Sequence, residues 1–456
     1  MKDKIRIASG QGFWGDLIDA PYHQVTRGDI DYLVMDYLAE VTMSILQKQK
    51  NKKPNLGYAR DLPELMRRIL PVCKEKGIKV ITNGGGVNPV SCADAILDEA
   101  LKLNIEDLKI AVVLGDDIKD RIDELFEAGA ELKNMDTGEP LSKVKDKILS
   151  ANVYFGAFPI VEALQKGADI VITGRTTDTG LTLAPMIYEF GWDSQNYDLM
   201  ASGTVAGHIL ECGAQSSGGN FLGNWESIDN FAEIGFPIAE AYPNGEVIIT
   251  KHEKTGGLVS YATVAEQLVY EIGDPKSYIT PDCVADFSSI KLEDLGNNRV
   301  KVYDVKGNKE TEFYKVSCSY SDGYLAVGSL TYSWPKALTK AKAADKIIRK
   351  RLENLNLKFD EIRTEFIGYN STQGPLSKEL DEDNINEIML RIAVRSEDKD
   401  SVARFGKEIA PLILTGPPSV TGFAGGRPKP SDVVAYWPAL IPKNLVEPHV
   451  KILELK

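Results

Sequence analysis

Residues 168–178 have the sequence ADIVITGRTTD, in which a short apolar run ends abruptly in a glycine, an arginine, hydroxyl side chains and an aspartate. An apolar run of this length between turn residues is typical of a strand buried on both faces, as in a parallel sheet covered by helices. In open sheets of this kind, ligands bind beyond the carboxyl ends of the strands. We therefore expect a functional edge where this run ends.

Three earlier segments change from apolar to polar in the same way. They are residues 32–40 (YLVMDYLAE), 80–88 (VITNGGGVN) and 110–117 (IAVVLGDD). Amphipathic helical patterns at 63–76 and 92–103 separate them, so the connections are of the βαβ type. If the four strands are parallel, their polar ends meet at one edge of the sheet, and that edge is the predicted site.

Two glycine-rich turns could approach an anion. Residues 10–15 follow the first expected strand with the spacing G-x-G-x-x-G of dinucleotide-binding turns. Phe13 and Trp14 are bulky where such a turn needs small residues, and Pro21 interrupts the helix that should follow, so this indication is weak. The three glycines at 84–86 can point several N–H groups at one anion, although a plain surface turn has the same spacing.

The length of 456 residues is too great for one core of ordinary size. After about residue 230 the composition shifts to β-branched runs, for example at 246–250 and 258–263, separated by hairpin turns. We predict an α/β domain over residues 1–230, with a mostly parallel, Rossmann-like sheet and flanking helices. We predict an α+β two-layer domain over 231–456, with an antiparallel sheet and a C-terminal glycine-rich loop. The acidic stretch 116–150 is expected to form a lid or side extension.

The composition limits the partners and the compartment. A net charge of −13 argues against nucleic acid, which needs a basic face. No apolar run approaches the roughly 18 residues of a membrane span, and the N-terminus lacks the apolar region of a signal peptide. The five cysteines are odd in number and scattered, without a C-x-x-C pair. We expect a cytoplasmic protein with no membrane partner, and a homo-oligomer at this size.

The candidate catalytic residues lie after the strand ends and on a helix. His208 and Glu211 are three positions apart in the helical pattern at 199–212, so they share one helix face. Proton abstraction beside a carbonyl needs a base, an acid and a group that stabilises the enolate. We predict Glu211 or Asp178 as the base, His208 as the acid or the reverse, and Arg175 or Arg427 as the clamp for a carboxylate. This set is typical of a hydratase or dehydratase.

The turns supply further candidates. The predicted substrate-binding residues are Asn83, Gly85, Asn88, Thr173, Arg175, Ser217, Gly218, Lys251 and Arg427. Asp36 and Glu40 are candidate ligands of a hard divalent cation such as Mg²⁺, which prefers oxygen, with Asp178 and Glu211 as further donors. No other cofactor is indicated. Cys212, at a helix end beside Gly213, is an alternative thiol nucleophile.

The chain resembles the acyclic terpene utilisation protein A family. The resemblance rests on residues 10–16 (GQGFWGD), 32–40, 82–89, 173–175 with Asp178, 203–219, 236–240 (FPIAE), 255–257, 267–287 and 415–436, which span nearly the whole chain. It implies a cytoplasmic role in the catabolism of branched acyl-CoA or organic acids. Some members carry a further short C-terminal domain that elsewhere is a separate small protein. This sequence ends at Lys456 without it, so we expect a small partner subunit.

Two functions remain open from the sequence. The first is a hydro-lyase acting on a small carboxylic acid or its CoA thioester. The second is a noncatalytic subunit that binds acyl-CoA or organises a catabolic complex, because broad glycine-rich surfaces would serve it equally well. We favour the enzyme because polar groups cluster at several strand ends rather than on one surface face.

Overall fold

The computed structural model describes residues 2–422 and 426–455. The chain forms two compact units, the first running up to Ser319 and resuming at Tyr436, the second spanning Tyr320–Ala435. Among the described residues, no helix is both long enough and apolar enough to cross a membrane. All five cysteines are free thiols.

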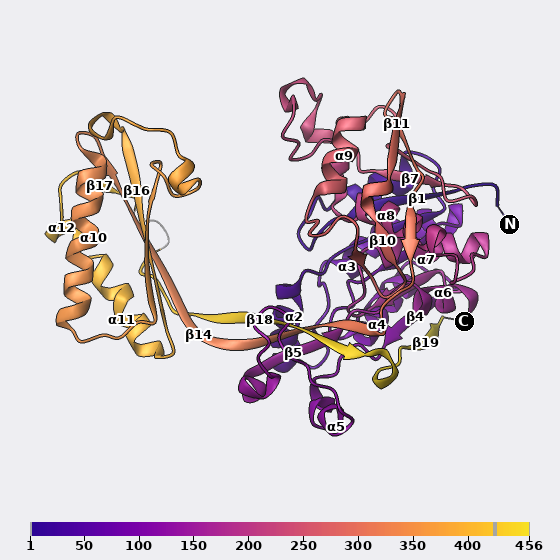
Figure 1. Ribbon diagram of the computed structural model, residues 1–456, viewed down its shortest axis with the longest axis horizontal. Coiled ribbons are helices and arrows are strands. Elements are labelled where there is room, and N and C mark those ends of the chain that lie inside the picture. Colours follow the sequence, from indigo (N-terminus) through magenta and orange to yellow (C-terminus); the bar gives the residue numbers. More distant parts are fainter. Residues whose placement is uncertain (1, 423–425, 456) are drawn as a thin grey trace. The chain divides into compact units, whose positions relative to one another are not determined.

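A ten-stranded mixed sheet organises the first unit (Figure 1). Its order is β11 (Lys291–Gly296), β12 (Arg299–Tyr303), β8 (Val247–Thr250), β7 (Ile238–Ala241), β1 (Ile5–Gln11), β2 (Tyr32–Met35), β3 (Lys79–Thr82), β6 (Ile170–Thr173), β4 (Lys109–Leu114) and β19 (His449–Glu454). The five strands from β1 to β4 in this order are parallel, as the sequence predicts. Strand β6 is buried along its whole length between β3 and β4, as its apolar run requires.

Helices cover both faces of this sheet. They are α1 (Ala20–Thr26), α2 (Glu40–Lys52), α3 (Leu62–Lys76), α4 (Pro89–Lys102), α6 (Phe158–Gln165), α7 (Gly180–Phe190) and α8 (Tyr197–Glu211). Helices α3 and α4 pack on one face, where Met66 and Ile96 join Leu33 and Ile172 in one apolar cluster. Helices α7 and α8 contact each other and strand β1 but contribute nothing to that cluster, so they cover the opposite face.

Smaller elements surround α8 and the sheet edge. A three-stranded sheet of β13 (Lys306–Asn308), β10 (Val284–Asp286) and β9 (Tyr278–Ile279) packs beside α8. Strand β5 (Ile148–Val153) pairs with β14 (Phe313–Ser333), and the stretch predicted as a side extension holds the short helix α5 (Ile122–Glu127). The run at 258–263, predicted as a strand, instead starts helix α9 (Tyr261–Val269), because Ser260 caps the helix by accepting from the backbone N of Thr263.

The first unit continues past residue 230, near which we predicted the domain boundary. Residues 231–319 lie in the first unit, where β7, β8, β11 and β12 continue the main sheet. Strand β7 pairs directly with β1, with Ala241 opposite Ile5. The shift in composition therefore marks a change from parallel to antiparallel pairing within one sheet.

The second unit is a two-layer α+β structure with an antiparallel sheet, as predicted. Its sheet holds β15 (Glu361–Ile367), β16 (Glu387–Ser396), the Tyr324–Ser333 part of β14, and β17 (Val420–Thr421). Helices α10 (Ala337–Asn354), α11 (Lys399–Ile409) and α12 (Leu412–Thr415) pack on it around a core that includes Phe405 and Leu390. Residues 423–425 of the predicted glycine-rich loop lie outside the described residues.

Candidate functional site

The polar ends of four parallel strands meet at one edge of the main sheet, as the sequence predicts. Asp36 follows β2 and Asn83 follows β3, and the Asn83 Nδ2 atom donates a hydrogen bond to Asp36 Oδ1 at 2.6 Å. Arg175 follows β6 and Asp116 follows β4, and the backbone N of Arg175 donates to Asp116 Oδ2 at 2.8 Å. Residues that are distant in sequence are thus cross-linked by hydrogen bonds at this edge.

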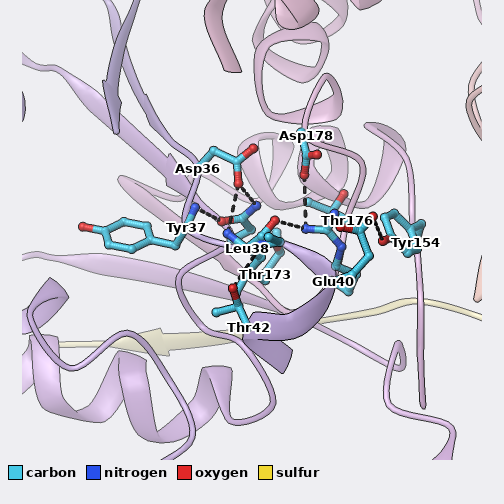
Figure 2. Close-up of polar contacts among 12 residues, drawn as sticks. Asp36, Tyr37, Leu38, Glu40, Thr42, Tyr154, Thr173, Thr176 and Asp178 are labelled. Atoms are coloured by element: carbon cyan, nitrogen blue, oxygen red, sulfur yellow. Dashed lines mark hydrogen bonds and ion pairs between the residues drawn. The ribbon is translucent and has the colours of Figure 1, made fainter. Parts of the chain in front are cut away.

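Arg175 is the central cation of the site and is almost completely buried. Its Nη1 atom donates to the carbonyl oxygen of Leu38 at 2.6 Å and lies 3.1 Å from Asp178 Oδ1, while its guanidinium carbon lies 4.3 Å from the centre of the Tyr154 ring (Figure 2). Burial opposes the charge, but Asp178, Tyr154 and Asp36 outweigh it and raise the pKa of Arg175. The arginine is therefore charged and fixed by the protein.

Asp36 and Asp178, both labelled in Figure 2, are two acids that interact electrostatically with each other and with Arg175. Burial, and next the charge of Asp178, raise the pKa of Asp36 well above its ordinary value. Burial also raises the pKa of Asp178, although Arg175 lowers it. Asp36 is buried, whereas about a third of the Asp178 side chain is exposed. Because interacting carboxyl groups disfavour each other's ionisation, each of these two acids keeps its proton to a higher pH than a free aspartate does.

Helix α8 carries a second proton-holding pair, His208 and Glu211. The Nε2 atom of His208 lies 2.9 Å from the carbonyl oxygen of Gln267, which can only accept, so Nε2 carries a hydrogen. The Nδ1 atom lies 2.9 Å from Glu211 Oε1. Burial lowers the pKa of His208, but Glu211 outweighs it and the net shift is upward. Burial raises the pKa of Glu211 against the effect of His208. His208 and Glu211 are therefore two close titratable groups, and the pKa of each is raised.

The contact between His208 and Gln267 is reciprocal. The side-chain Nε2 of Gln267 donates to the carbonyl oxygen of His208 at 2.9 Å, while the imidazole bonds the carbonyl oxygen of Gln267. The rings of Tyr278 and Phe287 meet the imidazole edge-on, with centroids 5.6 and 5.3 Å away. The ring of His208 is thus held in one orientation by α9 and by two aromatic side chains.

A cavity of about 430 Å³ adjoins both pairs. Its polar lining includes Asp178, His208, Glu211, Arg175, Glu40, Lys315, Thr177 and Thr179, and its apolar lining includes Met135, Ile279, Pro281, Phe313 and Leu440. The hydroxyl groups of Thr177 and Thr179 and the Nε atom of Arg175 have no hydrogen-bond partner among the described residues. The cavity therefore offers unused polar groups at one end and apolar surface at the other.

Glu40, Tyr154 and Lys315 form the more exposed side of the cavity. The Tyr154 hydroxyl donates to Glu40 Oε1 at 3.1 Å, and Lys315 Nζ lies 3.8 Å from the same oxygen and 5.0 Å from the centre of the Tyr154 ring. Burial raises the pKa of Glu40, but its own backbone N–H, Arg175 and Lys315 outweigh it, so the net shift is downward. Glu40 is therefore ionised at neutral pH.

Sequence reasoning missed Tyr154 and Lys315. Both depend on the pairing of β5 with β14, where the backbone N of Tyr154 donates to the Lys315 carbonyl at 2.9 Å. Because side chains two residues apart in a strand lie on the same face, Phe313 and Lys315 share a face. This alternation in the sequence could have predicted that Lys315 lies beside an apolar side chain.

The predicted metal ligands Asp36 and Glu40 face different partners. Asp36 accepts from the Asn83 amide, whereas Glu40 accepts the Tyr154 hydroxyl. Within residues 2–422 and 426–455, no three His, Cys, Asp or Glu side chains are arranged to hold a metal ion. The assignment of Mg²⁺ to these residues stays a prediction.

The glycine-rich turn after β3 packs tightly in the structure. A Cβ atom on Gly85 would lie 2.6 Å from the carbonyl oxygen of Thr173. Asn88 uses its side-chain amide to donate to two carbonyl groups of the loop 54–56, each at 2.8 Å. Thr173 is buried and donates to the carbonyl of the next residue. Close approach of the backbone accounts for these residues, and their predicted contact with substrate stays a prediction.

Three of the remaining predicted binding residues, Ser217, Gly218 and Lys251, do not line the cavity. Ser217 is fully buried, and Gly218 adopts a φ of 98°, which favours glycine. Lys251 donates from Nζ to the carbonyl oxygen of Thr255 at 2.8 Å. Arg427 is exposed in the second unit. Their roles in substrate binding stay predictions.

The first glycine-rich turn packs against the end of α8. The backbone N of Gly12 already donates to Asp16 Oδ2 at 2.9 Å, so this N–H is not free for a phosphate. A Cβ atom on Gly12 would lie 2.7 Å from the backbone of Cys212. Burial, with the charge of Glu211, raises the pKa of the Cys212 thiol to about 12, so it is protonated at neutral pH.

The comparison with known families matches almost the whole chain. A family model described as "Acyclic terpene utilisation family protein AtuA" matches residues 5–452. No curated protein and no solved structure matches the chain. The matched range includes both units and all the site residues described above, and it confirms the predicted family. The chain therefore belongs to the acyclic terpene utilisation (AtuA) family.

Proposed function

We propose that the chain is a hydro-lyase of acyclic terpene utilisation, a hydratase or dehydratase that acts on a carboxylic acid or its CoA thioester. One observation carries this proposal: Asp178, His208 and Glu211, which all have raised pKa values, line one cavity. The pKa of Glu211 is raised in part by the charge of Asp178, so the two pairs interact. The family's description supports the catabolic context.

Hydration of a double bond beside a carbonyl needs two proton transfers. A base removes a proton from water while the water oxygen bonds to the β-carbon. The π electrons move to the carbonyl oxygen and form an enolate, and an acid then delivers a proton to the α-carbon. Dehydration is the same sequence in reverse. Two groups with raised pKa values on one cavity are what this chemistry requires.

The two pairs suit the two transfers. Glu211 accepts the water proton when it is ionised beside a protonated His208, whose imidazolium is held by the Gln267 carbonyl. Asp178 delivers a proton to the α-carbon, because it is the member of its pair that lines the cavity, while Asp36 is buried behind it. Arg175, fixed beside Asp178, stabilises negative charge on the enolate oxygen.

The cavity suits a small acyl group. Its volume of about 430 Å³ lies within the usual range for small-molecule sites, roughly 300–1,000 Å³. Lys315 is the cation on its more exposed side, where a carboxylate would find a partner. In a CoA thioester, the acyl part would occupy the cavity and the nucleotide would extend beyond it.

The test is mass spectrometry of the purified chain incubated with unsaturated and hydroxylated carboxylic acids and their CoA esters. Gain or loss of one water supports the proposal, and Glu211→Gln and Asp178→Asn should abolish it. Glu162→Gln is the matched control, because Glu162 lies on the surface of α6, where it pairs with Lys166. Binding without any change in mass would support the noncatalytic acyl-binding subunit instead.

Three additions make the test complete. Mg²⁺ and a chelator in parallel reactions test whether Asp36 and Glu40 bind a metal. A candidate small partner subunit, added or omitted, tests whether activity needs a second chain. Size-exclusion chromatography with light scattering measures whether the chain is a homo-oligomer. Activity that is unaffected by Glu211→Gln and Asp178→Asn would contradict the proposal.

A further inference from the structure

A second cavity, of about 440 Å³, adjoins the site cavity within the first unit. It is formed by residues 129–135, which follow α5, together with Phe313, Leu440 and Pro442. Met135, Phe313 and Leu440 line both cavities. The two spaces therefore meet at these three side chains, which we call the apolar throat.

The apolar throat is open rather than packed. The exposed fractions of Met135, Phe313 and Leu440 are 53%, 45% and 41%. They come from three separate segments, so their clustering is a product of the fold. Large apolar side chains that cluster beside a cavity and stay half exposed are typical of a surface that a ligand covers.

The wall of the second cavity is firmly built. The backbone N of Met135 donates to the Pro438 carbonyl at 2.9 Å, and Trp437 Nε1 donates to the Leu132 carbonyl at 3.2 Å. Leu132 is fully buried and has a φ of 46°, a left-handed conformation that a leucine adopts only when its surroundings impose it. The stretch predicted as a lid or side extension thus forms a fixed side of this space.

The charges of the second cavity do not favour an anion. Its cation, Lys133, lies 3.0 Å from Glu131 Oε2 and is paired with it. The shared wall is apolar, and the polar, proton-holding groups all lie in the first cavity. A hydrocarbon chain therefore fits the second cavity better than the phosphate-bearing arm of a coenzyme.

We propose that the second cavity is a subsite for the hydrocarbon end of an elongated acyl ligand. The reacting carbons lie beside Asp178 and Glu211, the carboxyl or thioester group faces the cations of the first cavity, and the chain crosses the apolar throat into the second cavity. This orientation rests on the proposed function of the first cavity. The ligand class is a medium-length acyl chain whose hydrocarbon end is covered by the walls of the second cavity.

The test uses binding of saturated acids, which cannot be hydrated. Butanoic, hexanoic, octanoic and decanoic acid are titrated into the full chain by calorimetry. We expect the affinity to rise about three- to fourfold for each methylene up to decanoic acid, as for burial of apolar groups. Leu440→Trp should fill the throat and sharply reduce the ratio of decanoic to butanoic affinity, while Leu440→Ala should preserve that ratio.

The same series of saturated acids serves for the control variant and for the results that would contradict the proposal. Leu222→Trp places the same ring on a leucine that is 87% exposed and should leave the ratio at the wild-type value. If Leu440→Trp does not fold, Met135→Trp replaces it. Equal ratios in the wild type and in Leu440→Trp or its replacement Met135→Trp, or no binding by any acid, would overturn the subsite. Length-dependent binding without hydration of unsaturated acids would overturn the hydro-lyase alone, and hydration without length dependence would overturn the subsite alone.

Discussion

Carboxyl groups on the two sides of the site cavity have pKa values that are shifted in opposite directions. On the inner side, Asp36, Asp178 and Glu211 have pKa values above the ordinary range, with burial as the leading cause. On the outer side, Glu40 has a pKa below its ordinary value, because its own backbone N–H, Arg175 and Lys315 outweigh burial. Local hydrogen-bond donors and cations, rather than the residue type, decide which acids hold a proton.

The comparison gives the two sides different tasks. Groups that hold a proton near neutral pH can transfer it, whereas an ionised carboxylate can orient cations and hydroxyls. The inner side is therefore the place for proton transfer, and the outer side the place for positioning Tyr154 and Lys315. Each of the following experiments breaks or sharpens this division.

The largest effect is expected from removing the base of the inner side. Glu211→Gln keeps the shape of the side chain beside His208 but cannot accept the proton of water. We expect the turnover number to fall about a hundred- to ten-thousandfold, the usual contribution of general acid–base catalysis. Steady-state kinetics on the substrate found by mass spectrometry would measure it, and near wild-type turnover would remove Glu211 from the proposed mechanism.

The next effect concerns the cation between the two sides. Arg175→Gln leaves Asp178 and the Leu38 carbonyl without their charged partner in a buried setting. We expect the free energy of unfolding in urea to fall by about 3–5 kcal/mol, as when one partner of a buried ion pair is removed. Arg68→Gln is the matched control, because its pair with Asp19 is exposed and should contribute less than about 1 kcal/mol.

A pH experiment tests whether burial raises the pKa of a carboxyl group at this sheet edge. Burial raises the pKa of Asp116 to about 7, so the folded chain binds this proton more tightly than the unfolded chain does. The stability from this group is complete below its unfolded pKa near 4 and is lost as the pH rises to about 7. Between these values, wild-type unfolding free energy should fall relative to Asp116→Asn by about 1 kcal/mol per pH unit.

Urea unfolding at several pH values checks this sign. The variant keeps an oxygen that can accept from the backbone N of Arg175, so its fold should be preserved. The other inner acids act in both proteins and cancel in the difference. A difference between the two proteins that stays constant from pH 4 to 7 would show that Asp116 does not titrate in this range.

The smallest effect is expected on the outer side. Tyr154→Phe removes the hydroxyl that donates to Glu40 but keeps the ring against Arg175 and Lys315. We expect the free energy of unfolding to fall by about 0.5–1.5 kcal/mol, the net value of one hydrogen bond. Tyr261→Phe, at an exposed tyrosine, should change nothing measurable. A loss several times larger would mean that the outer side is as tightly coupled as the inner side.

Much of the inner side could be predicted from the sequence, because it depends on local patterns. The apolar run of β6 fixes where Arg175 and Asp178 begin, and helical spacing brings His208 to Glu211. Parallel strands then carry Asp36 to the same edge. Each of these steps follows from a local sequence pattern of a strand or a helix. None needs to know which distant segment pairs with it.

The rest depends on pairings that no local pattern contains. Lys315 reaches the cavity only because β14 pairs with β5, more than 150 residues earlier. The antiparallel strands after residue 230 have the composition of a separate domain, yet β7 completes the first sheet by pairing with β1. The glycines of the turn after β3 allow neighbouring atoms to pack closely against the backbone. An anion-binding turn needs glycines at the same spacing, so the sequence cannot tell the two apart.

The reciprocal contact between His208 and Gln267 has a consequence for variation of this protein. The atom that fixes the tautomer of His208 is a main-chain oxygen, which every residue at position 267 would supply. Substitution there removes only the amide that fastens α9 back to α8. Substitutions at position 267 should therefore leave the tautomer of His208 unchanged. They can alter how rigidly α8 and α9 are held together.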